Sequence, residues 1–147
     1  MPQQGFGATV SNWVREVKAR ELAVFRESTQ RVLDLAQTPT SAGGRMRVDT
    51  GFLRASLVLT LGHPGFAVTF NPGGPAKVTY NEAATSLVIL SAKINDTISA
   101  VWTANYAIHR EFGANGQPPD AFVRMAAQQW AQIVAQVVAD LKAKRGG

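Results

Sequence analysis

The residues with the most obvious chemical potential are His109 and Glu111, which lie two positions apart in the segment YAIHREFG. A His-x-Glu pair belongs to the zinc deaminase signature, but that signature also needs cysteine ligands, and this chain contains no Cys. The second histidine, His63, lies far away in the sequence, so it offers no zinc-ligand spacing with His109. The sequence therefore predicts no metal centre.

Hydrolytic sites are equally hard to assemble from this sequence. A Ser-His-Asp arrangement could be drawn from Ser56, His109 and Asp49, yet the Gly-x-Ser-x-Gly turn that presents such a serine is absent. A carboxylate pair for glycoside hydrolysis would have to come from acids scattered along the chain: Asp49, Glu82, Asp96, Glu111 and Asp120. Because nucleophile, base and orienting group cannot be identified together, we expect a protein that is not an enzyme and uses no cofactor.

The chain is basic, with a formal net charge of +5. Basic residues of the first predicted helix alternate with acidic ones, which is typical of a solvated helix face. Arg45 and Arg47 lie in a Gly-rich loop without the Walker spacing, and Lys142, Lys144 and Arg145 lie near the end of the chain. These five residues are the candidates for contacts with phosphate groups or with an acidic partner.

The length of 147 residues fits a single domain covering residues 1–147. The first residues lack the basic start and apolar core of a signal peptide, and no apolar run reaches the roughly 20 residues that cross a bilayer. We therefore expect a soluble intracellular protein, or part of a particle assembled inside a cell, without membrane contact.

Two long helices must position most of these residues. Apolar residues recur every three or four positions over residues 9–36, with Thr9 or Ser11 as the cap, and again over residues 120–144, with Asp120 as the cap. The first helix would be about 40 Å long, so it either packs within its own domain or projects in part toward a neighbour. Residues 1–8 and 142–147 are predicted to be tails.

Four short apolar segments between these helices are predicted to be strands: residues 57–61, 66–70, 86–91 and 98–103. Short links between them favour antiparallel pairing. The predicted fold class is therefore α+β, with about four mainly antiparallel strands packed against the two helices. Residues 62–84 are rich in Pro and Gly and form either part of the sheet or an arm.

Residues 101–122 are interpreted as a fixed elbow between the sheet and the last helix. The segment begins as a strand and continues as a short amphipathic turn over residues 106–112, which Gly113 ends. Pro118 and Pro119 then interrupt regular structure before Asp120. The expected role of this elbow is geometric rather than catalytic.

The order of these segments resembles a known family. A Thr-Gly-x-Leu-Arg-x-Ser segment at residues 50–56 follows the long helix, and a Tyr-Ala-x-x-x-Glu-Phe-Gly segment stands at residues 106–113. A Pro-rich loop and an Ala-rich helix beginning FVRMA complete the order. This arrangement is similar to the neck or tail-completion proteins of long-tailed bacteriophages, the HK-type gene-10-like family to which the lambda protein Z type is related.

The resemblance implies a structural virion protein at the head–tail junction, assembled in the host cytoplasm. Such a subunit would form a homo-oligomeric ring, most plausibly a hexamer, around the channel through which genomic DNA passes. Its partners would be head-closure or connector proteins on one side and tail-terminator or tail-tube proteins on the other. A gene transfer agent could use the same position.

We hypothesise that the first helix and the elbow lie at the subunit interfaces of this ring. A cyclic ring uses head-to-tail interfaces, in which one face of a subunit meets a different face of the next. The candidate interface residues are Trp13, Thr50, Gly51, Leu53, Arg54, Tyr106, Arg110, Glu111, Phe112, Gly113, Pro118 and Pro119.

Two alternatives remain open at the level of sequence. A tail-terminator ring protein would share this organisation. A nucleic-acid-binding module would use Arg45, Arg47 and the basic C-terminal tail, and its affinity for DNA would fall steeply with salt.

Overall fold

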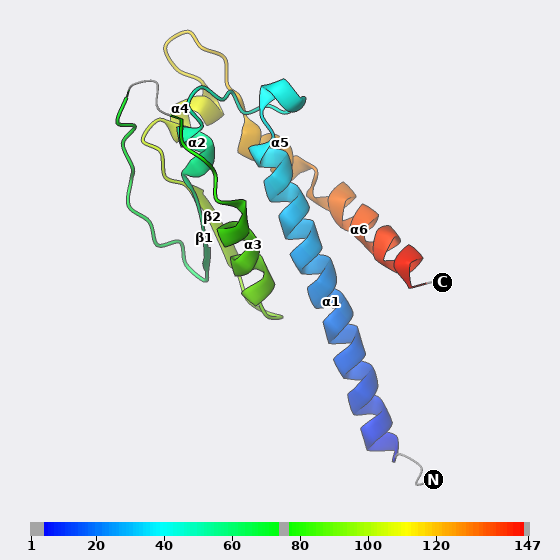
Figure 1. The fold of residues 1–147 in the computed structure, drawn as a ribbon. Coiled ribbons are helices and arrows are strands. Elements are labelled where there is room, and N and C mark those ends of the chain that lie inside the picture. The colour runs from blue at the N-terminus through cyan, green and yellow to red at the C-terminus, as the bar shows by residue number, and fades with distance from the viewer. Residues whose placement is uncertain (1–4, 74–76, 146–147) are drawn as a thin grey trace.

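The fold is arranged around one long helix, α1 (Phe6–Gln37). The computed structural model describes residues 5–73 and 77–145. The C-terminal half of α1 lies between two groups of elements, with the strands and α3 on one side and α5 and α6 on the other (Figure 1). After α1 the elements are η1 (Thr40–Ala42), α2 (Phe52–Ala55), β1 (Leu57–Leu61), α3 (Glu82–Ser91), β2 (Ile98–Trp102), α4 (Ala107–Phe112), α5 (Phe122–Gln128) and α6 (Trp130–Lys144).

The N-terminal half of α1 projects away from the rest of the molecule (Figure 1). All of its buried residues lie between Ser28 and Gln37, whereas Trp13 is 63% exposed. The predicted caps Thr9 and Ser11 are wrong, because the helix starts earlier, after Gly5. Thr9 instead lies inside the helix, where its hydroxyl donates a hydrogen bond to the Gly5 carbonyl oxygen.

The sheet has two strands among the described residues, so the prediction of about four is wrong. β1 and β2 pair antiparallel, with Leu57 opposite Trp102 and Leu61 opposite Ile98. Residues 66–70 are extended but touch the sheet only through Thr69, whose N–H donates to the Thr103 carbonyl oxygen at 2.8 Å. This segment lacks a continuous ladder and does not form the predicted strand.

The predicted strand at residues 86–91 is instead the second half of helix α3. Asn81 caps this helix, since its side-chain oxygen accepts a hydrogen bond from the Ala84 N–H at 3.0 Å. Thr85 and Ile89, four residues apart, are its buried positions. A short apolar run fits a strand or a helix by periodicity alone, and here the cap favours the helix.

The predicted continuous helix over residues 120–144 is divided at Gln129 into α5 and α6. Asp120 is not its cap, because Ala121 precedes α5 with a positive φ of 53° and the Asp120 carboxylate faces Arg47. Helix α6 packs against α1, to which it is joined by an ion pair between Arg31 and Asp140 at 2.9 Å.

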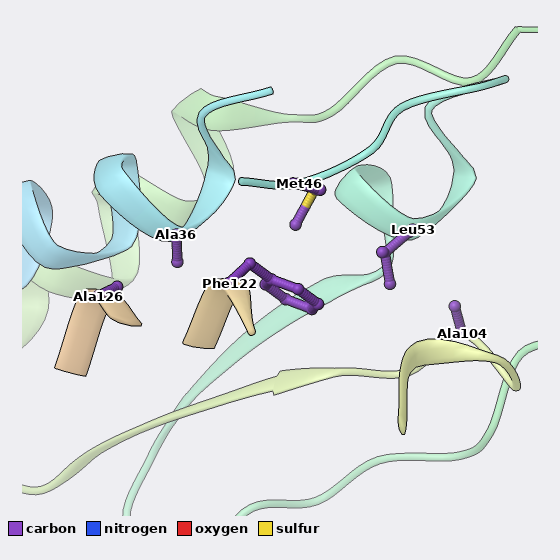
Figure 2. Close-up of a cluster of buried hydrophobic side chains, with 6 residues drawn as sticks. All are labelled: Ala36, Met46, Leu53, Ala104, Phe122 and Ala126. Carbon is purple, nitrogen blue, oxygen red and sulfur yellow. The ribbon is translucent and has the colours of Figure 1, made fainter. Parts of the chain in front are cut away.

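The core consists of two adjoining clusters of apolar side chains. In the first, the Phe122 ring points from the start of α5 toward Met46 and Leu53 (Figure 2). The second joins Leu33 of α1 to the sheet and to Ile89 of α3. Trp102 packs against both clusters, and its indole N–H donates to the buried Gln37 side chain at 2.8 Å.

The predicted arm at residues 62–84 is largely an extended segment on the outside of the fold (Figure 1). Its last part belongs to α3, and residues 77–80 form an extended loop that is held by Val78, whose N–H donates to the Thr50 carbonyl oxygen at 2.8 Å. Residues 74–76 of this arm, residues 1–4 of the predicted N-terminal tail and residues 146–147 of the basic tail lie outside the described residues.

Candidate interaction surface

The two sequence motifs at residues 50–56 and 106–113 pack against each other in the fold. The rings of Phe52 and Tyr106 lie 6.1 Å apart. Partial burial raises the pKa of the Tyr106 phenol, although its hydrogen bond with the backbone of Leu53 opposes that shift. Leu53 itself is buried in the first core cluster. The motifs therefore form one structural unit within the subunit.

The motif at residues 50–56 is fastened to its surroundings by backbone contacts. Gly51 has a φ of 86°, and a Cβ atom there would lie 2.5 Å from the Val78 carbonyl oxygen, so only glycine fits. The Thr50 carbonyl oxygen accepts the hydrogen bond from the Val78 N–H described above. Arg54 donates to the Gln37 carbonyl oxygen at 2.8 Å, and its guanidinium lies 5.3 Å from the centre of the Tyr80 ring.

Glu111 is the cap that the sequence did not identify. Its buried carboxylate accepts hydrogen bonds from the backbone N–H groups of Val123 and Arg124, both at 2.9 Å, in the first turn of α5. The Arg124 side chain adds an ion pair at 3.0 Å and lies over the Phe112 ring. A carboxylate in this position satisfies N–H groups that a helix start leaves free. The elbow thus holds α5 through a glutamate.

Asp120 organises the other side of the elbow. It is buried, and its carboxylate binds both the backbone N–H and the side chain of Arg47. Arg47 also donates to the Gln117 side chain and to the Pro118 carbonyl oxygen. Arg45 donates to the Asp120 carbonyl oxygen at 2.6 Å. Both arginines, predicted as phosphate or acidic-partner contacts, are therefore bound within the subunit.

Gly113 ends α4 with a positive φ of 84°, and a Cβ atom there would lie 2.9 Å from the Gln117 carbonyl oxygen. Its ψ of 153° lies outside the left-handed helical region, so it differs from a left-handed cap. Pro119 is exposed. Arg110 lies over the Tyr106 ring, with its guanidinium 5.9 Å from the ring centre.

The predicted interface residues differ in burial, and half of them are partly buried: Thr50, Gly51, Arg54, Tyr106, Arg110 and Gly113. Leu53 and Glu111 are buried inside the subunit, whereas Trp13 and Phe112 expose about 60% of their surface. The predicted cations Lys142, Lys144 and Arg145 are exposed at the end of α6.

Exposed apolar side chains that the sequence analysis did not single out gather on the outer parts of the molecule. In the extended segment Phe66 and Val68 are 54% exposed and Phe70 is 74% exposed. Leu87 and Leu90 of α3 also face outward. For the residues of the extended segment, the sequence shows an alternation of apolar side chains over 66–70, from which a strand was predicted.

His109 is exposed, and the described residues hold no group of three His, Asp or Glu side chains suited to a metal ion. Glu111 and Asp120 already serve structural hydrogen bonds. Among the described helices none is both long and apolar enough to cross a bilayer.

Comparison with known proteins finds no matching family model, no similar curated protein and no similar solved structure.

Proposed function

We propose that the protein is a structural subunit of the head–tail junction of a tailed phage or a related particle. It forms a homo-oligomeric ring, which we propose to be a hexamer, that completes the tail and connects it to the head. The observation that carries this proposal is the set of large apolar side chains exposed on two projecting parts: the N-terminal half of α1 and the extended segment at residues 62–73.

Isolated exposed apolar residues are ordinary, but the two most exposed large apolar side chains among the described residues, Phe6 and Phe70, lie on these two parts. Phe6 and Trp13 are 86% and 63% exposed on a helix that extends beyond the core. A ring offers such parts a neighbour on each side. The order of the motifs at residues 50–56 and 106–113 supports the phage family in particular, and their packing makes them one unit.

The same ring would carry the partners that the resemblance implies. Head-closure or connector proteins would bind one face of the ring, and tail-terminator or tail-tube proteins the other. Genomic DNA would pass through the lumen, where Lys142, Lys144 and Arg145 are the candidates for weak phosphate contacts. Arg45 and Arg47 stay candidates for such contacts, although each already donates a hydrogen bond to Asp120 within the subunit.

Electron microscopy of particles made without this protein tests the proposal. Full heads and complete tails that remain separate are the expected result. Normal virions would refute it. Tails of uncontrolled length would instead identify a tail terminator, since that protein stops growth of the tube.

The nucleic-acid-binding alternative has its own measurement. A ring subunit has little affinity for free DNA, and we expect that affinity to stay weak as salt is lowered to about 50 mM. Tight binding that weakens by orders of magnitude between about 50 and 200 mM salt would favour the alternative. The variant Lys142→Ala/Lys144→Ala/Arg145→Ala would then show whether the tail is responsible.

A further inference from the structure

Strand β2 pairs with β1 on one side only, and its outer edge has no partner strand among the described residues. The pairs Ser56–Thr103 and Gly62–Thr97, at the two ends of the ladder, are joined by backbone hydrogen bonds. Because hydrogen-bonded and non-bonded pairs alternate in an antiparallel ladder, Ser99 and Val101 direct their backbone groups toward β1. The alternate residues of β2 are Ile98, Ala100 and Trp102. Their backbone N–H and C=O groups point away from β1, and no described hydrogen bond uses these groups.

This outer edge borders an open groove. The groove has a volume of about 370 Å³ and lies between α1, β2 and the first residue of α6. Phe25, Val32 and Ile98 line it with apolar surface, and Trp130, which is 40% exposed, stands at the α6 side. A strand added to β2 would place every second side chain on this surface.

The chain itself contains a segment with the matching properties. In residues 66–70 the side chains of Phe66, Val68 and Phe70 alternate with Ala67 and Thr69, so in an extended conformation they share one face. Thr69 uses its N–H and C=O to bind Thr103 and Asn105. The backbone groups of Val68 and Phe70 consequently point the other way, and no described hydrogen bond uses them.

The two unpaired edges cannot meet within one subunit. The Thr103 N–H donates to the Ser56 carbonyl oxygen, which places this side of Thr103 toward β1. The Thr103 carbonyl oxygen on the same side accepts from Thr69. The extended segment is therefore fixed on the β1 side of the sheet, opposite the free edge of β2.

We propose that residues 66–70 of one copy add to the outer edge of β2 in a second copy. This inference rests on the proposed ring and names its subunit contact. The added strand forms backbone hydrogen bonds with Ile98, Ala100 and Trp102, and its apolar face covers Phe25, Val32 and Trp130 in the groove. The added segment and the edge that receives it lie on different faces of the subunit, as a head-to-tail contact requires, and such a contact forms a ring when the rotation between neighbouring copies closes.

Disulfide trapping tests this contact directly, because the natural chain has no cysteine. Ala100→Cys is combined in one chain with Phe66→Cys, Val68→Cys or Phe70→Cys, and particles assembled with each double variant are oxidised. Neighbouring strands lie about 4.8 Å apart, within the Cα separation that a disulfide bridges. The expected result is a ladder of cross-linked subunits on a non-reducing gel for at least one pair.

Ala67→Cys provides the matched control, because its side chain faces away from that of Ala100 in the proposed pairing. Its combination with Ala100→Cys should yield only monomers on the gel. Assembled particles without a ladder from any of the three pairs would refute strand addition while leaving the ring intact. A disulfide confined to one subunit would also refute it. Normal virions without the protein would instead refute the proposed function.

A pair of proline variants checks the backbone requirement independently. Val68→Pro removes an N–H that the proposed contact uses, whereas Ala67→Pro removes one that points toward the segment's own subunit. Both purified variants should keep the wild-type circular dichroism and melting temperature, because neither N–H has a described partner. Only Val68→Pro should lower particle yield, by tenfold or more. Equal yields for the two variants would contradict the proposal.

Discussion

The elbow at residues 101–122 and the projecting parts of the molecule use their side chains in opposite ways. In the elbow, the buried carboxylates of Glu111 and Asp120 are each bound by backbone N–H groups and by an arginine. In the N-terminal half of α1 and in residues 62–73, large apolar side chains such as Trp13 and Phe70 face outward. The carboxylates of the elbow therefore have hydrogen-bond partners within the subunit, whereas these apolar side chains are exposed.

This difference shows which residues remain available to a partner. Buried polar groups that already have hydrogen bonds lose them if they are recruited elsewhere, which costs about 1–3 kcal/mol for each unsatisfied group. Exposed apolar groups gain from being covered, by about 25 cal/mol per Å². The hypothesis that Glu111 forms a subunit contact stays a prediction, and within the subunit its carboxylate binds the first turn of α5.

Two tryptophans give the sharpest test of this contrast. Trp102→Ala should lower the free energy of unfolding by about 4 kcal/mol, because it removes a ring from both core clusters and the hydrogen bond to Gln37. Trp13→Ala should change it by less than about 0.5 kcal/mol but reduce particle assembly. Urea denaturation and particle yield measure the two effects. A large loss of stability in Trp13→Ala would show that the projecting helix is not an independent surface.

Glu111→Ala tests the cap inside the elbow. The change leaves two backbone N–H groups of α5 without their acceptor, so we expect the free energy of unfolding to fall by about 3 kcal/mol. Urea denaturation measures this fall. Glu21→Ala, on the exposed half of α1, is the control and should be neutral within about 0.5 kcal/mol. Equal stability of the two variants would show that Glu111 does not stabilise the elbow as a cap of α5.

Asp120→Asn tests the second fastening of the elbow, and a loss of about 2 kcal/mol is expected because the charge-assisted bonds to Arg47 weaken. A double-mutant cycle with Arg47→Ala should give a coupling energy of about 1–2 kcal/mol. The same cycle with Arg145→Ala should give none, since Arg145 is exposed at the far end of α6. A vanishing coupling with Arg47 would mean that the two residues act separately.

Periodicity was sufficient to predict the long first helix, the helical character of most of residues 120–144, the strand at residues 57–61 and all but the last residue of the predicted strand at 98–103. These segments carry long or strongly patterned signals, such as the repeated apolar residues of α1. Local sequence is enough where one face of an element must be buried.

The remaining errors arise where tertiary contacts decide between local alternatives. The run at residues 86–91 is apolar enough for a strand, but the cap at Asn81 extends a helix through it. Residues 66–70 have the alternation of a strand, but only Thr69 finds a backbone partner within the subunit. The cap of α5 comes from Glu111, about ten residues upstream, so local capping rules chose Asp120 instead.

The smallest expected effect is on the pH dependence of stability, and it concerns two aspartates, Asp34 of α1 and Asp140 of α6. Partial burial is the main cause that raises the pKa of Asp34 above 3.8, and the hydrogen bond from Gln30 opposes it. Hydrogen bonds from Gln136 and then Arg31 lower the pKa of Asp140 below 3.8. Linkage gives the two groups opposite signs, since stability follows the difference in bound protons between the folded and unfolded states.

The folded state binds the proton of Asp34 more tightly than the unfolded state. The contribution of Asp34 to stability is therefore present below pH 3.8 and is lost as the pH rises through the raised pKa of the folded state. For Asp140 the contribution is present above pH 3.8 and is lost as pH falls through the lowered value. As the pH rises from about 3 to about 6, a range around the ordinary pKa of a carboxyl group, the stability of Asp34→Asn should therefore increase relative to wild type. The stability of Asp140→Asn should decrease relative to wild type as the pH rises over the same range. Urea denaturation at several pH values measures both changes. Shifts of the same sign would contradict the surroundings assigned to Asp34 and Asp140.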